Sequence, residues 1–187
     1  INPMAHAPAL LEMIGVPYIG HNPLAVSILD NKHVFKSMCM AASLPTARSV
    51  VIDPSSEGCN FIYSEHFESV FYGFPGPFVI KPVSGRASKN VYFVDSKREV
   101  KHAVEKVWNE TNHLCLVEEY LPGREFAISI MGSRVRQEGE FVIHDEPFAF
   151  SAVQRVFEPH EKIFTSMDEK PINDDRIRLL DLSRESG

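Results

Sequence analysis

The sequence predicts an α+β fold in which helices cover one face of a mostly antiparallel sheet. Over residues 78–131 the expected order is strand, loop, strand, helix, strand and strand, which is too irregular for repeated βαβ units. Residues 1–50 are richer in helical spacing than residues 75–145. With 187 residues and 44% hydrophobic content, the chain can bury roughly 70% of its unfolded surface, enough for one moderate core or two small ones.

The N-terminal part predicts two helices, each followed by a strand. Residues 8–14 carry apolar side chains at helical spacing and end at a glycine, which suits a helix C-terminus. Residues 16–20 indicate a short strand. A second helix is expected from Asn22 to Pro45, because asparagine caps the first turn and proline ends the helix. Residues 46–52 have strand character.

The elements after this point alternate between loops, strands and one long helix. Residues 53–58 are a loop by composition, and residues 78–80 form a buried strand. The next strand is residues 91–94. Residues 96–99 have the spacing of a capping box, in which a serine and a glutamate satisfy each other's backbone N–H groups, so a helix starts there. Its apolar face is expected to consist of Val100, Ala103, Val104 and Val107. Two further strands are expected, at residues 114–118 and 125–131.

Charge and composition exclude several classes of partner. The chain has 25 acidic and 19 basic residues and a formal charge of −6, so no basic field attracts nucleic acid or anionic lipid. No apolar run approaches the roughly 20 residues of a membrane span, and no signal peptide is visible, so we expect a cytoplasmic protein. The unpatterned Cys39, Cys59 and Cys115 are expected to be free thiols. Because the chain starts at Ile1 and ends in polar sequence, we expect it to be part of a longer protein.

A candidate nucleotide site begins at Lys81, which ends an apolar strand and precedes the small-residue loop 85–90. Lysine contacts phosphate as a compact charge, and small side chains leave the backbone amides of a loop accessible to anions. Downstream, Glu118, Glu119 and Glu125 can accept hydrogen bonds from adenine and ribose. Each feature alone also fits a solvated strand edge, but together they predict ATP binding.

These residues resemble the ATP-grasp family, and within it the D-alanine–D-alanine ligases. The resemblance covers about residues 8–132 and rests on segments in the family's order, at compatible spacing. They are residues 10–20, 30–32 with 43–45, 78–91 and 116–125. The resemblance implies that Lys32 and Lys81 contact the ATP phosphates, and that Ser88 and its neighbours form a flexible loop that closes over them.

The resemblance also assigns the other end of the nucleotide. Glu118 and the backbone from Glu119 to Leu121 would hold adenine, and Glu125 would hold the ribose. Members of the family join a carboxylate to an amine through an acyl-phosphate, and magnesium offsets the phosphate charge. The partners implied are therefore ATP and small carboxylate and amine substrates, amino acids among them, with no nucleic acid and no membrane. A homodimer is left open.

Two short segments depart from the family's pattern. Asn31 precedes Lys32 where the family usually has aspartate, and the acid, Asp30, lies one position earlier. In the loop, Arg86 and Asn90 stand where glycines are common. Asparagine tolerates a positive φ better than other non-glycine residues. Arg86 either adds a phosphate contact or stiffens the loop.

The resemblance implies three parts of the chain. Residues 1–44 are the end of an α/β N-terminal domain with a linking helix, residues 45–132 the nucleotide-binding subdomain, and residues 133–187 an incomplete start of the second ATP-grasp subdomain. The family's magnesium ligands lie beyond the hairpin equivalent to residues 124–145, and nothing here resembles that segment. We therefore assign no catalytic or metal-binding residue, and expect that the chain alone does not complete catalysis.

The leading hypothesis is the ATP-binding central part of an ATP-dependent carboxylate–amine ligase. One alternative is a non-catalytic ATP-binding sensor or scaffold module that has lost its metal-binding segment. The other is a structural α+β domain in which the motifs occur by coincidence. A rise in melting temperature with ATP distinguishes both nucleotide-binding hypotheses from the structural one.

Overall fold

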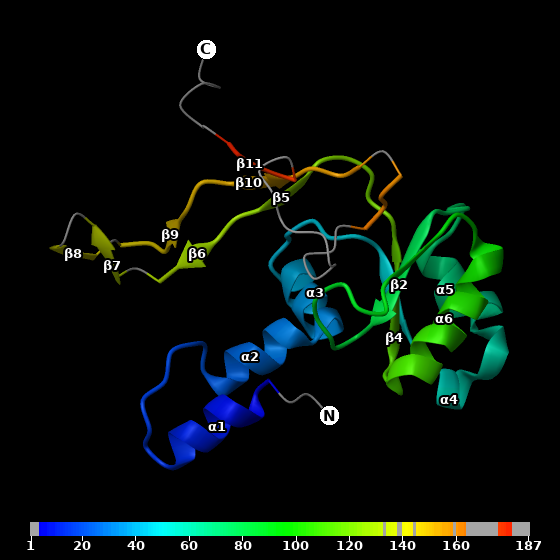
Figure 1. Cartoon of the computed structure of the whole chain (residues 1–187). Coiled ribbons are helices and arrows are strands. Elements are labelled where there is room, and N and C mark those ends of the chain that lie inside the picture. The colour runs from blue at the N-terminus through cyan, green and yellow to red at the C-terminus, as the bar shows by residue number, and fades with distance from the viewer. Residues whose placement is uncertain are drawn as a thin grey trace. The chain divides into compact units, whose positions relative to one another are not determined.

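The computed structural model describes residues 4–132, 134–137, 140–143, 145–158, 160–163 and 176–180. The chain divides into two compact units, Ile1–Leu121 and Pro122–Gly187. Both contain antiparallel strands, and helices cover a sheet in the first (Figure 1). The predicted α+β fold, helices on a mostly antiparallel sheet, is therefore confirmed.

The first unit consists of one four-stranded sheet with helices around it. Its helices are α1 (His6–Met13), α2 (Pro23–Asp30), α3 (Lys32–Ala41), α4 (Pro54–Glu57), the 3-10 helix η1 (Gly58–Tyr63), α5 (Glu65–Val70) and α6 (Lys97–Thr111). Its strands are β1 (Ser49–Ile52), β2 (Phe78–Pro82), β3 (Tyr92–Val94) and β4 (Cys115–Glu119), in the order β1-β4-β2-β3. The two central strands, β2 and β4, carry Lys81, Glu118 and Glu119 of the predicted nucleotide site.

The hydrophobic core lies between this sheet and α5 and α6, which cover one of its faces (Figure 1). Successive strand residues point to opposite faces, so Phe78 and Ile80 enter the core while Lys81 lies on the other face. The ring of Phe78 packs edge-on against those of Phe71 and Phe74, with centroids 5.2 and 5.1 Å away. These aromatic contacts fix the strand that carries Lys81.

The long helix α6 forms where the capping box predicted it. The Ser96 N–H donates to the Glu99 carboxylate at 3.1 Å, which satisfies one of the first free amides of the helix. Its predicted apolar face is buried against the sheet. That face consists of Val100, Ala103, Val104 and Val107.

Two N-terminal expectations are wrong. Residues 16–20 form no strand but an irregular turn, because Pro17 offers no N–H to a sheet and Gly20 has a φ of +142°. The single helix expected from residue 22 to 45 is two helices that meet at Asn31. The Asn31 side chain accepts a hydrogen bond from the Val34 N–H at 3.1 Å, so Asn31 caps α3 instead of continuing α2.

Two later expectations also need correction. Residues 53–58 are not a loop but contain α4, because Asp53 accepts the Ser55 N–H at 3.0 Å and Pro54 suits a first helical turn. The continuous strand expected over residues 125–131 is interrupted at residues 128 and 129. Its two halves pair with different partner strands, which explains the break.

The second unit contains only short strands among its described residues. They are β5 (Glu125–Ala127), β6 (Ile130–Met131), β7 (Arg134–Gln137), β8 (Glu140–Ile143), β9 (Phe148–Ala149), β10 (Val153–Arg155) and β11 (Ile177–Leu179). They pair as β11-β10-β5, β6-β9 and β7-β8. The three-strand sheet places Glu125 opposite Arg155.

The remaining sequence expectations concern cysteines and membranes. Cys39 and Cys115 are free thiols, as predicted. Burial raises the pKa of the Cys115 thiol to about 12, so this thiol stays neutral and inert at physiological pH. Within the described part of the chain, no helix has the length and apolar character needed to cross a bilayer.

Replacing Gly76 by alanine should lower the free energy of unfolding by about 3 kcal/mol. Gly76 has a φ of +126°, and a Cβ atom there would lie 2.5 Å from the carbonyl oxygen of Asp95. Gly73 is the matched control, because its φ is +67° and a Cβ atom would meet nothing within 4 Å. Gly73→Ala should cost only about 1 kcal/mol. Equal losses in urea titrations of the two variants would contradict the steric argument.

Candidate nucleotide-binding site

The open face of the sheet carries a buried carboxylate between two lysines. Glu118 pairs through Oε1 with Lys36 Nζ at 2.9 Å and through Oε2 with Lys81 Nζ. Lys36 also donates to the Thr46 hydroxyl at 2.8 Å. Only about a tenth of the Glu118 and Lys36 side chains is exposed. Glu118 therefore fixes the ammonium group of Lys81 at the end of β2.

Strand register explains why Lys81 and Glu118 meet. In the antiparallel pair β2 and β4, Val79 lies opposite Glu118 and Lys81 lies opposite Leu116. Lys81 and Glu118 are thus diagonal neighbours on the same face, within reach of long side chains. The register is set by the apolar residues of the other face, since a slip of one position would expose the core.

Lys32 reaches the same region from the first turn of α3. Its Nζ donates to the carbonyl oxygens of Gly85 at 2.9 Å and Val83 at 3.4 Å. Burial, and secondly the positive charge of Lys81, lower the pKa of Lys32 below its usual value. The two predicted phosphate-binding lysines, 49 positions apart in the sequence, thus act on each other electrostatically. An anion bound between them would relieve this repulsion and raise that pKa.

The loop after β2 has an unusual backbone. Ala87, Ser88 and Asn90 all have positive φ angles, between 53° and 58°, and Gly85 has a φ of 140°. Asparagine tolerates this conformation, as expected for Asn90, but alanine and serine adopt it at a cost of order 1–2 kcal/mol. Strained backbone of this kind is concentrated at ligand-binding loops. The predicted phosphate loop therefore has a conformation that ordinary surface turns seldom need.

Glu119 lies on the opposite side of the strand from Glu118. Arg48 donates to Glu119 Oε1 from its backbone N–H at 2.9 Å and to Oε2 from its Nε at 2.7 Å. Partial burial acts to raise the pKa of Glu119, but these hydrogen bonds and the charge of Arg48 outweigh it and lower the pKa below the usual value. The Glu119 carboxylate is thus engaged by Arg48 in this structure, and its predicted role toward adenine stays a prediction.

Two backbone N–H groups of the predicted adenine segment, residues 119–121, already donate hydrogen bonds within the fold. The Glu119 N–H donates to the Arg48 carbonyl at 3.1 Å, and the Tyr120 N–H donates to the Pro77 carbonyl at 3.0 Å. Leu121 is exposed at the end of the first unit. The assignment of residues 119–121 to adenine stays a prediction.

Glu125 belongs to the second unit, at the start of β5. It forms an ion pair with Arg155, its partner on β10. Both side chains are partly exposed, so the pair contributes little to stability. The ribose contact assigned to Glu125 stays a prediction, because the ion pair is compatible with a solvated strand edge as well.

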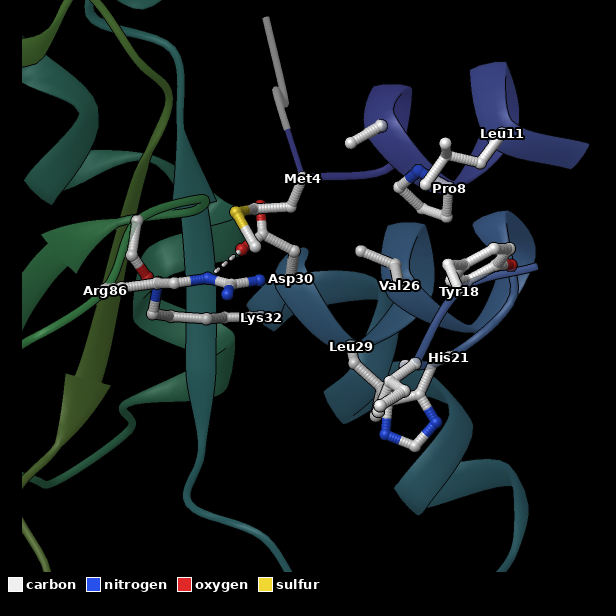
Figure 2. A pocket seen from close by; sticks show the side chains of 14 residues that line it. Met4, Pro8, Leu11, Tyr18, His21, Val26, Leu29, Asp30, Lys32 and Arg86 are labelled. Carbon is white, nitrogen blue, oxygen red and sulfur yellow. Dashed lines mark hydrogen bonds and ion pairs between the residues drawn. The ribbon is translucent and has the colours of Figure 1, made fainter. Parts of the chain in front are cut away.

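A pocket of about 540 Å³ opens beside the loop in the first unit. Figure 2 shows Asp30, Lys32 and Arg86 at one side of it, and Pro8, Leu11 and Tyr18 at the other. The helices α1 and α2 supply its apolar walls. This volume lies within the range of small-molecule sites, which are mostly apolar with a few polar groups.

Three charged residues of this region are not among the predicted nucleotide ligands. Lys36 lies one helical turn after Lys32 on the same helix face, and that spacing was the available signal. Asp30 and Arg86 form an ion pair, Nε to Oδ1, at 3.0 Å. No local signal links them, because they are 56 positions apart. The two departures from the family's pattern, the shifted acid and the arginine in the loop, thus contact each other.

Metal-binding residues do not cluster in the described part of the chain. Among those residues, no three side chains of the types that bind metals (His, Cys, Asp and Glu) come together. Magnesium binds through several oxygen ligands, of which carboxylates are the commonest from proteins. We therefore place no ion on the described residues.

Comparisons with known proteins indicate which family the chain resembles. Residues 74–150 match the ATP-grasp domain family. The D-alanine–D-alanine ligase of Geobacter sulfurreducens is 32% identical over 149 residues, which are 76% of this chain and 42% of that protein. An uncharacterized protein, y4sG, of Sinorhizobium fredii is 28% identical over 129 residues, 69% of this chain and 35% of that protein. The chain thus spans less than half the length of these relatives.

Solved structures share the fold. The D-alanine–D-alanine ligase from Coxiella burnetii superposes with a TM-score of 0.66 at 20% identity, over 82% of this chain and 41% of that one. The VanG D-Ala:D-Ser ligase from Enterococcus faecalis gives a TM-score of 0.63 at 20% identity, over 81% and 39%. At this identity the likeness concerns the fold alone.

Proposed function

This chain is a member of the ATP-grasp family that resembles the D-alanine–D-alanine ligases, and we propose that it is the ATP-binding part of an ATP-dependent carboxylate–amine ligase. One observation carries the proposal. Lys32 donates to the start of the strained loop, Lys81 directly precedes that loop on β2, and burial together with the charge of Lys81 lowers the pKa of Lys32. A polyanion such as the triphosphate of ATP is the ligand that such a site would stabilise.

The proposed reaction has two steps. A carboxylate oxygen of the first substrate attacks the γ-phosphorus of ATP, the bond to the β-phosphate oxygen breaks, and an acyl-phosphate and ADP form. The amine then attacks the acyl carbon, inorganic phosphate leaves, and the nitrogen loses a proton. Lys32 and Lys81 would hold the phosphate oxygens in line for the first step and stabilise their charge.

The pocket beside the loop supports a small organic substrate. It borders Lys32, Gly85 and Arg86, so a group held there would lie next to the proposed phosphate end of the nucleotide. Amino acids are the substrate class that the ligase relatives suggest. The magnesium that such reactions use and the homodimer stay predictions.

Glu125→Ala should weaken ATP binding by about 1.5–3 kcal/mol and leave inorganic triphosphate binding unchanged, because ribose is the expected partner of this carboxylate. Titration calorimetry on the whole chain measures both ligands. Arg155→Met is the matched control, since it breaks the same ion pair and keeps the carboxylate. Equal losses for ATP and triphosphate would contradict the ribose assignment.

The ligase activity itself needs a separate test. A screen of amino acids for stimulated ADP release, carried out on the whole protein, should identify one or more that raise the rate above the rate with ATP alone. ATP binding without stimulation by any carboxylate or amine would favour the non-catalytic sensor or scaffold instead. Failure to bind ATP would remove the proposal entirely.

A further inference from the structure

The last residue of α2 is a buried carboxylate. Only 5% of the Asp30 side chain is exposed, and a buried carboxylate is unfavourable unless it is paired. Its partner is Arg86, whose Nε donates to Asp30 Oδ1 at 3.0 Å (Figure 2). Arg86 belongs to the loop that follows β2, so the ion pair ties this loop to the junction of α2 and α3.

The same junction also holds the loop through Lys32, two positions after Asp30. The Lys32 backbone N–H donates to the Val83 carbonyl at 3.0 Å, and its Nζ donates to the Gly85 carbonyl at 2.9 Å. With the weaker bond from Lys32 Nζ to the Val83 carbonyl, at 3.4 Å, and the ion pair, four contacts from one short segment hold the start of the loop, residues 83–86. The non-glycine residues with positive φ angles follow directly after it, at Ala87 and Ser88.

We propose that Asp30 and Arg86 form a positioning pair, which fixes the start of the phosphate loop so that the loop amides meet the triphosphate while Arg86 stays on Asp30. This inference rests on the proposed ATP binding. Arg86 does not leave Asp30 for the nucleotide, because an unpaired buried carboxylate is more unfavourable than one further phosphate contact is favourable. Under the proposed function, Lys32 and Lys81 would supply the positive charges that the phosphates need.

A double-mutant cycle distinguishes this role from direct phosphate contact. Asp30→Asn and Arg86→Met should each weaken ATP and inorganic triphosphate about tenfold, and adenosine not at all. The double variant should bind no more weakly than either single one, because each change removes the same contact. Arg86→Lys should recover part of the loss.

Three outcomes of these binding measurements would overturn the positioning pair. If Arg86→Met weakens ATP binding and Asp30→Asn does not, Arg86 contacts the nucleotide and the positioning pair is overturned. If the unsubstituted chain binds ATP and neither change weakens that binding, the positioning pair is overturned and the proposed function stands. If the unsubstituted chain binds no ATP, both proposals fall.

Hydrogen exchange of the nucleotide-free chain provides a second readout. In both single variants, amides of residues 84–90 should exchange faster while those of α6 keep their protection. If the Asp30→Asn variant does not fold, the exchange experiment uses Arg86→Met alone. This substitution is the milder one, because about half of the Arg86 side chain is exposed. Unchanged exchange in the loop would overturn the proposal even if ATP binding were weaker.

Discussion

Replacing Glu118 by glutamine should lower the free energy of unfolding of the first unit by about 3–5 kcal/mol. Glutamine keeps the shape of the side chain but removes the negative charge that lies between Lys36 and Lys81. Because about nine-tenths of the Lys36 side chain is buried, its charge cannot be solvated in place. Urea titration followed by the fluorescence of Trp108, the single tryptophan of the chain, measures the loss.

The neighbouring carboxylate is the matched control. Glu119 pairs with Arg48, whose side chain is 42% exposed, so Glu119→Gln should cost only about 1 kcal/mol or less. Adding Lys36→Met to Glu118→Gln should restore part of the stability, because it removes the buried charge left unpaired. A Glu118→Gln loss no larger than that of Glu119→Gln would show that the two lysines do not depend on this carboxylate.

The sequence alone could predict the parts of the fold that depend on local patterns. The strand that ends at Lys81, the capping box at Ser96 and the apolar face of α6 are all confirmed, because each is encoded within a few neighbouring residues. The strand expected at residues 16–20 is wrong because Pro17 and Gly20 disfavour it locally. A strand also needs a partner strand, and the apolar pattern of its own residues does not show whether one is present.

The candidate site was likewise predictable from the sequence only in part. Lys81 and the loop can be predicted from their residue types, and Lys32 from the family resemblance. In the structure Lys32 donates to the Gly85 carbonyl of the loop, and its pKa is lowered by burial and by the charge of Lys81. The contact between Asp30 and Arg86 could not be found, because it joins positions 56 residues apart that each look irregular alone. Nor does the sequence show that Glu118 and Glu119 point to opposite faces until the strand is known.

Lys81→Met should weaken ATP binding by about 2–4 kcal/mol, which corresponds to roughly 30- to 1,000-fold in the dissociation constant. The loss is expected because one or two charge-assisted contacts with phosphate oxygens disappear, while the alkyl part of the side chain is kept. Binding of adenosine should be unchanged, since it has no phosphate. Titration calorimetry with ATP, inorganic triphosphate and adenosine separates these contributions.

Lys36→Met controls for the indirect effect of the Lys81 substitution. Both changes take one lysine from Glu118, but Lys36 is buried and donates to Thr46, so it is not expected to reach the nucleotide. Disturbance of Glu118 alone would weaken ATP binding equally in the two variants. A loss confined to Lys81→Met, and to ligands that carry phosphate, would show that the ammonium group at the end of β2 acts on the triphosphate directly. Equal losses would instead mean that Lys81 serves the fold through Glu118, and the phosphate site would then rest on Lys32 and the loop amides.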